Sequence, residues 1–139
     1  QNLKSFYPEL GKSLGEALLT PTRIYVKQVL DLIDKVSVKS ISHITGGGFY
    51  ENIPRALPEG ISARIRKDSY EVPAIFKLIQ SEGNIPERDM YNTFNMGIGM
   101  MVVVDKADAQ KAIEILASHG DKAYIIGETF ASDEGVVIE

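Results

Sequence analysis

The residues best suited to contact a ligand are three consecutive glycines, Gly46–Gly48. They lie between a run typical of a β-strand and a run typical of a helix. Glycine adopts positive φ readily and lets a ligand approach the bare backbone. The free N–H groups at the start of the following helix, aided by the helix dipole, suit an anion such as phosphate. The pattern therefore predicts a phosphate-binding turn.

Neighbouring side chains could add to this site. Asn52 and Arg55 follow the glycines at a spacing that places both on one side of a helix. Two known phosphate motifs do not fit: a Walker loop needs a lysine after its glycines, and the dinucleotide fingerprint needs a glycine where Glu51 stands. The alternative is that the glycines only form a tight turn between strand and helix.

A second candidate segment contains Asn95, Gly97 and Gly99, where glycines alternate with large residues as a strand begins. Strand interiors normally avoid glycine, and the exceptions mark a bulge or the close approach of a ligand or another backbone. Contact with a ligand is therefore one explanation of these residues. Packing of a helix against the strand is the other, and the pattern does not choose between them.

Thr22 and Arg23 form a third candidate, just before the first long helix. Thr22 is expected to be the N-cap of that helix, since a threonine hydroxyl can accept from the free N–H groups. The Arg23 guanidinium could contact a phosphate or a carboxylate.

The chain has two histidines, His43 and His119. His43 stands directly before the glycine turn, within reach of whatever binds there, and an imidazole can act as a general acid or base near neutral pH. A hydrogen-bonded structural role is an equal alternative for His43. His119 is expected at the C-terminal end of a helix, where a positive charge would interact favourably with the helix dipole.

The elements that must position these residues alternate along the chain. Residues 1–22 are expected to be irregular, with one short strand at Ala17–Leu19. Helices are predicted from the apolar spacing of Val26, Val29, Leu30 and Ile33, from just after the glycines to Leu57, from Pro73 to Gly83, and over Ala109–Leu116. Strands are predicted at 39–45, 61–66, 99–104, 123–126 and 136–138, with a polar loop after Gly83. This alternation predicts one α+β domain over residues 1–139, a mixed β-sheet covered by helices.

Composition limits the classes of function. The chain has 139 residues, 44% of them hydrophobic and 24% charged, which is ordinary for a folded protein. It has no cysteine, which excludes disulfides, thiolate metal sites and a cysteine nucleophile, and two histidines make a zinc site improbable. A net charge of −4 argues against nucleic-acid binding. No apolar run is long enough for a membrane span or a signal peptide, so a cytoplasmic location is expected.

Three motifs together resemble the phosphoribosylformylglycinamidine cyclo-ligases, also called aminoimidazole ribonucleotide synthetases. They are the runs His43–Arg55, Gly15–Val26 and Tyr91–Met100, which occur in the order of that family. The resemblance implies an enzyme of de novo purine synthesis that uses ATP and Mg²⁺ to close the imidazole ring of formylglycinamidine ribonucleotide. It also implies a partly ferredoxin-like fold.

The resemblance further implies that this chain is only part of an enzyme. Family members are more than twice as long, and their N-terminal domain carries acidic metal ligands, ATP-phosphate contacts and most of a homodimer interface. The first residue, Gln1, agrees with a piece cut from a longer chain. We therefore expect a C-terminal domain, inactive alone, that binds the ribonucleotide through Thr45–Gly48, Asn52 and Arg55. Asn95, Gly97 and Gly99 are expected alongside the cleft, His43 is a candidate for proton transfer, and no metal is expected on this chain.

Two other functions remain open at this point. Relatives in the same superfamily phosphorylate other substrates: thiamine-phosphate kinase, selenophosphate synthetase, a hydrogenase maturation factor and formylglycinamidine synthetase. A non-catalytic binding module that keeps the glycines only for its fold is the third possibility.

Overall fold

The computed structural model describes residues 2–139. The strands are β1 (Phe6–Tyr7), β2 (Lys12–Ser13), β3 (Val38–His43), β4 (Ile61–Ile65), β5 (Met100–Val104), β6 (Gly127–Ala131) and β7 (Val136–Ile138). The α-helices are α1 (Leu14–Leu18), α2 (Val26–Lys35), α3 (Gly48–Arg55), α4 (Ala74–Gly83), α5 (Glu87–Thr93) and α6 (Ala109–Ser118). Helices and mixed strand pairings thus combine as predicted, and the α+β class is confirmed.

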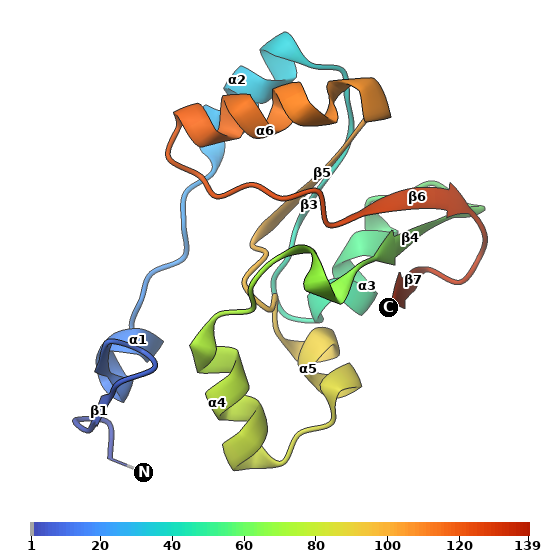
Figure 1. The fold of residues 1–139 in the computed structure, drawn as a ribbon. Helices are drawn as coiled ribbons and strands as arrows, with labels where there is room; N and C mark the ends of the chain where they lie inside the picture. Colours follow the sequence, from blue (N-terminus) through green and yellow to red (C-terminus); the bar gives the residue numbers. More distant parts are fainter. Residues whose placement is uncertain (1) are drawn as a thin grey trace.

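An antiparallel pair of strands, β3 and β5, runs between two groups of helices (Figure 1). Side chains alternate between the two faces of a strand, so β5 serves both groups. Val102 and Val104 pack on the side of α2 and α6, whereas Met101 and Val103 join a larger core that includes α3 and α5. The strand pair therefore separates a small hydrophobic cluster from a large one.

A three-stranded sheet supplies the mixed strand directions. β4 lies in its centre, antiparallel to β6 and parallel to β7. Ala63 and Ile65 of β4 are buried and belong to the same core as Phe49 and Ile53 of α3, which are fully buried. Helix α3 is thus fixed between β3 and this sheet, and the glycines at its start are held with it.

Helix α2 forms where predicted, but it is rotated about its axis, so that other residues than expected face the core. Val26, Leu30 and Ile33, predicted to face the core, are exposed. Leu32 and Val36 are buried instead, against Ala112 and Ile115 of α6. The prediction of the inward residues is therefore wrong, because the apolar side of this helix is wide and α6 covers only the part next to Leu32 and Val36.

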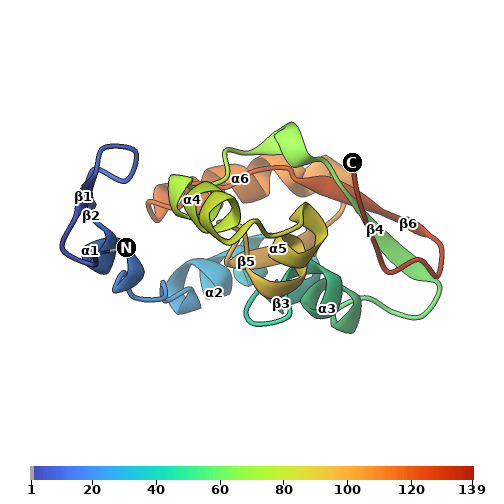
Figure 2. The ribbon, with the colours of Figure 1, turned by 90° about the horizontal axis from the view of Figure 1, so that it is seen from below.

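The N-terminal part differs from the prediction as well. The expected strand at Ala17–Leu19 is wrong, because Leu14–Leu18 form α1, which begins with a capping box between Ser13 and Glu16. Thr22 is not the N-cap of α2, since Tyr25 occupies that position without a side-chain cap bond. Figure 2 shows β1, β2 and α1 set to one side, joined to α2 by residues 20–25.

Farther along, the predicted polar loop contains a helix, α5, which the sequence reading missed. The predicted strand at 123–126 is wrong, because the strand is β6, which begins at Gly127 opposite Ile65. The other predicted helices and strands are confirmed with small shifts at their ends. Among residues 2–139, no helix combines the length and the apolar character needed to cross a bilayer.

Candidate functional site

The glycine turn joins the end of β3 to the start of α3. Gly47 and Gly48 have φ of 93° and 54°, in the left-handed region that favours glycine. The Gly48 N–H donates to the Thr45 carbonyl at 3.0 Å, and the Glu51 N–H donates to the Gly47 carbonyl at 3.1 Å. These bonds start the helix, so the predicted strand–turn–helix arrangement is present.

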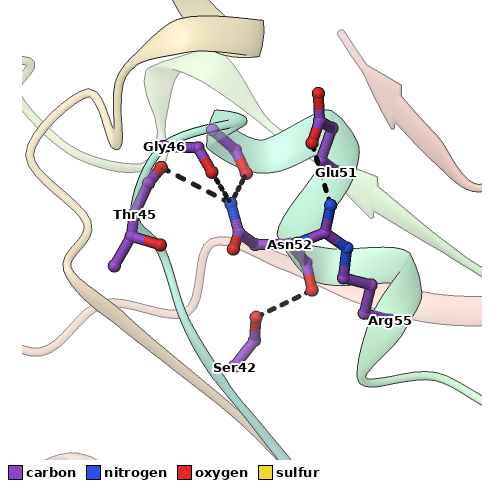
Figure 3. Close-up of polar contacts among 7 residues, drawn as sticks. Ser42, Thr45, Gly46, Glu51, Asn52 and Arg55 are labelled. Atoms are coloured by element: carbon purple, nitrogen blue, oxygen red, sulfur yellow. Dashed lines mark hydrogen bonds and ion pairs between the residues drawn. The ribbon is translucent and has the colours of Figure 1, made fainter.

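Asn52 holds the turn from inside (Figure 3). Its Nδ2 lies 2.8 Å from the Gly48 carbonyl oxygen, 3.1 Å from that of Gly46 and 3.4 Å from that of Thr45. The residue is buried, and its own carbonyl accepts from the Ser42 hydroxyl at 2.9 Å. The amide donors of Asn52, predicted to contact a ligand, therefore point to the backbone of the turn.

The three glycines have different tasks. A Cβ on Gly48 would lie 2.0 Å from the Tyr91 carbonyl oxygen, and one on Gly47 would lie 2.6 Å from a Glu51 carboxylate oxygen. Both positions need glycine for packing within the domain. Gly46 is exposed, and a Cβ there would meet no atom within 4 Å. Gly46 is thus the glycine at which a ligand can approach the turn.

Two features of α3 act on the charge near this turn. The backbone N–H groups of Phe49 and Tyr50, in its first turn, make no hydrogen bond within the described residues. The exposed Arg55 guanidinium pairs with the Glu51 carboxylate at 2.9 Å. Arg55 could contact an anion at the turn only by leaving Glu51, and the sequence did not indicate that Glu51 pairs with it.

The second glycine segment lies beside the first. The Ile44 N–H donates to the Gly99 carbonyl at 2.9 Å, and His43 faces Met100 across the strand pair. The structure therefore brings together two of the three predicted segments, at the end of β3 and the beginning of β5.

Gly97 and Gly99 themselves are explained by packing. A Cβ on Gly97 would lie 2.5 Å from the Pro73 ring, and one on Gly99 would lie 2.0 Å from the Tyr25 hydroxyl oxygen. The Asn95 carboxamide oxygen accepts from the Gly97 N–H at 2.9 Å, which shapes this loop. Of the two explanations left open by the sequence, close packing is the one these contacts support.

His43 lies at this edge with its side chain exposed. Its ring meets the Tyr25 ring edge-on, with centroids 5.9 Å apart, and makes no hydrogen bond within residues 2–139. Burial raises the pKa of the Tyr25 phenol, so this neighbour stays neutral at physiological pH. Tyr25 was missed, because no local pattern marks it as a neighbour of the strands.

The third predicted segment is tied elsewhere. The Arg23 guanidinium bonds the Asp121 carboxylate at 2.6 Å and the Gly120 carbonyl at 3.2 Å, fastening the chain before α2 to the end of α6. Thr22 is exposed, with no side-chain hydrogen bond in the part of the chain described. Neither side chain joins the glycine turn.

His119 has a partner that the sequence did not reveal. Its Nε2 lies 2.9 Å from an Asp31 carboxylate oxygen, and Lys35 contacts the other oxygen at 2.7 Å. The bond from Lys35, followed by that from His119, holds the pKa of Asp31 below its ordinary value. This cluster joins α2 to α6.

Across residues 2–139, no group of three or more His, Asp or Glu side chains is placed to hold a metal ion.

Comparison of the sequence with known proteins identifies the family of this chain. The family described as AIR synthase related protein, C-terminal domain, matches residues 2–139. The phosphoribosylformylglycinamidine cyclo-ligase of Lachnoclostridium phytofermentans is 55% identical over 98% of this chain and 40% of its own length. The proteins of that name from Thermoanaerobacter sp. strain X514 and Lachnospira eligens are 54% and 53% identical over 99% of the chain, and 40% and 41% of theirs.

The chain therefore spans about 40% of the length of these curated relatives. The matched residues include the glycine turn, the β3–β5 edge and all the elements that position them. With a family match over 2–139 and more than half of the residues identical to these relatives, the chain belongs to the AIR synthase C-terminal domain family.

Proposed function

We propose that residues 1–139 act as a single domain of an ATP-dependent phosphoribosylformylglycinamidine cyclo-ligase. This enzyme closes the imidazole ring of formylglycinamidine ribonucleotide, giving aminoimidazole ribonucleotide, ADP and phosphate. The observation that carries the proposal is 53–55% identity to relatives of that name over nearly the whole chain. Because the chain spans about 40% of those relatives, the complete active site requires the region that precedes this domain.

Within that enzyme, this domain supplies one wall of the substrate cleft. The phosphate of the ribonucleotide approaches the turn at Gly46, where space is open, and accepts from N–H groups at the start of α3. Thr45 adds its hydroxyl, and Arg55 exchanges Glu51 for the phosphate. Asn52 positions the turn, and Asn95, Gly97 and Gly99 shape the neighbouring edge.

The chemistry proceeds in two steps. The formyl oxygen attacks the γ-phosphorus of ATP, forming an O–P bond and releasing ADP. The amidine nitrogen then attacks the activated formyl carbon, a C–N bond forms, and the C–O bond breaks with loss of phosphate. His43, exposed at the same edge, accepts the proton released by the nitrogen. Positioning of the two reacting groups provides most of the rate enhancement.

ATP and Mg²⁺ are bound mainly by the preceding region. When bound, Mg²⁺ would neutralise charge on the transferred phosphoryl group. In the same proposal the full-length enzyme is a homodimer and is cytoplasmic. Sedimentation of the purified full-length protein would test the homodimer.

Ring closure assayed on separated pieces tests the proposal. This chain is mixed with ATP and formylglycinamidine ribonucleotide, with and without a separately produced N-terminal portion. Activity only in the mixture is expected. Activity of the chain alone would mean that ATP binds here, and silence in both with folded pieces would favour a related kinase or a binding module.

Variants of the full-length enzyme test the role of the turn. Gly46→Val narrows the open approach to the turn, and Arg55→Ala removes the guanidinium, so both should raise KM for the ribonucleotide about tenfold or more. Lys77→Ala, at an exposed position on α4, is the matched control. An unchanged KM in both turn variants would exclude phosphate binding at this turn.

A further inference from the structure

A stripe of aliphatic side chains is exposed on the outer side of α2. Val26, Leu30 and Ile33, at helical spacing, are 60%, 61% and 48% exposed. Ile41 of β3, 36% exposed, lines a shallow groove together with Ile33 and Val38. We name the four residues Val26, Leu30, Ile33 and Ile41 the α2 stripe.

The interior of the domain does not account for this stripe. Contact with α6 covers only part of the apolar side of α2, the part with Leu32 and, just after the helix, Val36, whereas an ordinary surface helix turns its whole apolar side to the core. At these exposures the stripe amounts to roughly 400 Å² of apolar surface, a size that on a monomer often marks an interaction site. Lys27 and Asp34, both exposed, lie on the polar side of the same helix.

We infer that the α2 stripe is the docking surface for the region that precedes this domain in the full-length chain. More than half of the length of the curated relatives lies outside the matched part, and the matched family is described as a C-terminal domain. That region is linked to α2 through residues 2–25, whose last stretch, 20–25, has no regular secondary structure and leads directly into Val26, the first residue of α2. The stripe begins where this connection ends.

The size of the stripe favours an intramolecular partner over a second copy. A stable interface between separate proteins takes about 800 Å² on each side, twice what the stripe offers. A linked partner needs less, because the linker raises its effective concentration to the millimolar range. The facing surface should be mainly aliphatic, with a polar or acidic group able to meet Lys39 at the end of the groove near Ile33 and Ile41.

Photo-crosslinking of the full-length protein identifies the occupant. A benzoylphenylalanine at position 30 is irradiated in a mixture of ¹⁴N- and ¹⁵N-labelled protein, and the joined peptides are identified by mass. We expect crosslinks from position 30 to the preceding region within one chain. Crosslinks between ¹⁴N and ¹⁵N chains would assign the stripe to a second copy and overturn the inference. The same probe at Glu114, exposed on α6, is the control.

Charged substitutions give an independent measurement. In the full-length protein, Leu30→Lys with Ile33→Lys should raise hydrogen exchange in α2 and in the preceding region at least tenfold. The exchange of α6 and β5 should stay unchanged, which shows that the domain remains folded. Lys27→Glu with Asp34→Lys, on the same helix, should have no such effect. Exchange unchanged in the stripe variant, or a probe at position 30 that joins nothing, would contradict docking. Neither readout uses ring closure, so docking and the proposed activity fail separately.

Discussion

The N–H of Ile44 donates to the carbonyl of Gly99 at 2.9 Å and continues the β3–β5 ladder one step past the end of β3. This bond sets the glycine turn beside the loop that contains Asn95 and Gly97. Tyr25 covers the same point from the start of α2, because its hydroxyl occupies the space that a side chain on Gly99 would need. The geometry of the candidate site therefore depends on a close contact between Gly99 and Tyr25.

Replacing Gly99 by alanine tests that contact. The new Cβ would lie 2.0 Å from the Tyr25 hydroxyl oxygen and 3.1 Å from the ring carbon that carries it. We expect Gly99→Ala to lower the free energy of unfolding by about 1–3 kcal/mol, as overpacking does. Urea denaturation measures the loss, and much of it should disappear in the Tyr25→Phe background, which lacks the hydroxyl. An equal loss in both backgrounds would refute the role of Tyr25.

Removing the Asn52 amide should destabilise the domain. Asn52→Ala leaves the carbonyls of Thr45, Gly46 and Gly48 without this donor, at a cost of about 1–3 kcal/mol for a buried group. Asn52→Asp should cost more, since an ionised carboxylate has no proton to donate to three carbonyl oxygens. Chemical denaturation compares both with Asn92→Ala, an exposed control. Stability equal to that of the control would show that the three bonds contribute nothing.

Replacing two glycines of the turn by alanine should affect stability very differently. Gly48→Ala combines a positive φ with a Cβ 2.0 Å from the Tyr91 carbonyl oxygen, and should cost about 3 kcal/mol or more. Gly46→Ala meets open space and should change stability by less than about 0.5 kcal/mol. Thermal unfolding of the two variants side by side decides this, and similar losses would mean that Gly46 is also needed for the fold.

The contacts of Asp31 predict a dependence of stability on pH. The pKa of its carboxyl is held below the ordinary value of 3.8, first by Lys35 and then by His119. A carboxyl whose pKa is lower in the folded state stabilises the fold above its unfolded pKa, and loses that effect as pH falls through the folded value. Asp31→Asn should therefore unfold at lower temperature than the parent at pH 7.

The difference between Asp31→Asn and the parent should shrink as pH falls below about 4. Thermal melts between pH 7 and pH 2 measure it. Asp34→Asn, on the same helix and without an ion pair in the described part of the chain, is the control. A difference that stays constant down to pH 2 would rule out the ionised carboxylate as its source.

The sequence predicted the elements with a strong local pattern. The glycine turn, the helix that follows it and the strands at 39–45 and 61–66 form close to the expected residues. Helix α5 was missed because only Met90 and Tyr91 of its seven residues are buried, so no apolar period marks it. The displaced strand, β6, is set by pairing with β4, a partner distant in sequence.

The orientation of side chains was harder to predict than the elements themselves. Helix α2 has one wide apolar side, and nothing local decides which part of it packs on α6. The same holds at the candidate site. The sequence does not show whether an asparagine on α3 is buried or exposed. Asn52 was therefore predicted to contact a ligand, whereas its side chain is buried. The sequence alone explains Gly97 and Gly99 equally well by contact with a ligand or by close packing within the domain. The positions of Pro73 and Tyr25 in the structure decide for packing.

The triple contact of Asn52 also determines what the turn presents to solvent. In a planar trans peptide the C=O and the N–H of one unit point in opposite directions. The carbonyls of Thr45, Gly46 and Gly48 face the buried amide, so the N–H groups of Gly46, Gly47 and Phe49, in the same peptide units, point away from it. The turn is thus ordered during folding rather than during binding. In the proposed site, a bound anion would lose no affinity to loop ordering, a cost that a flexible glycine loop would impose on every binding event.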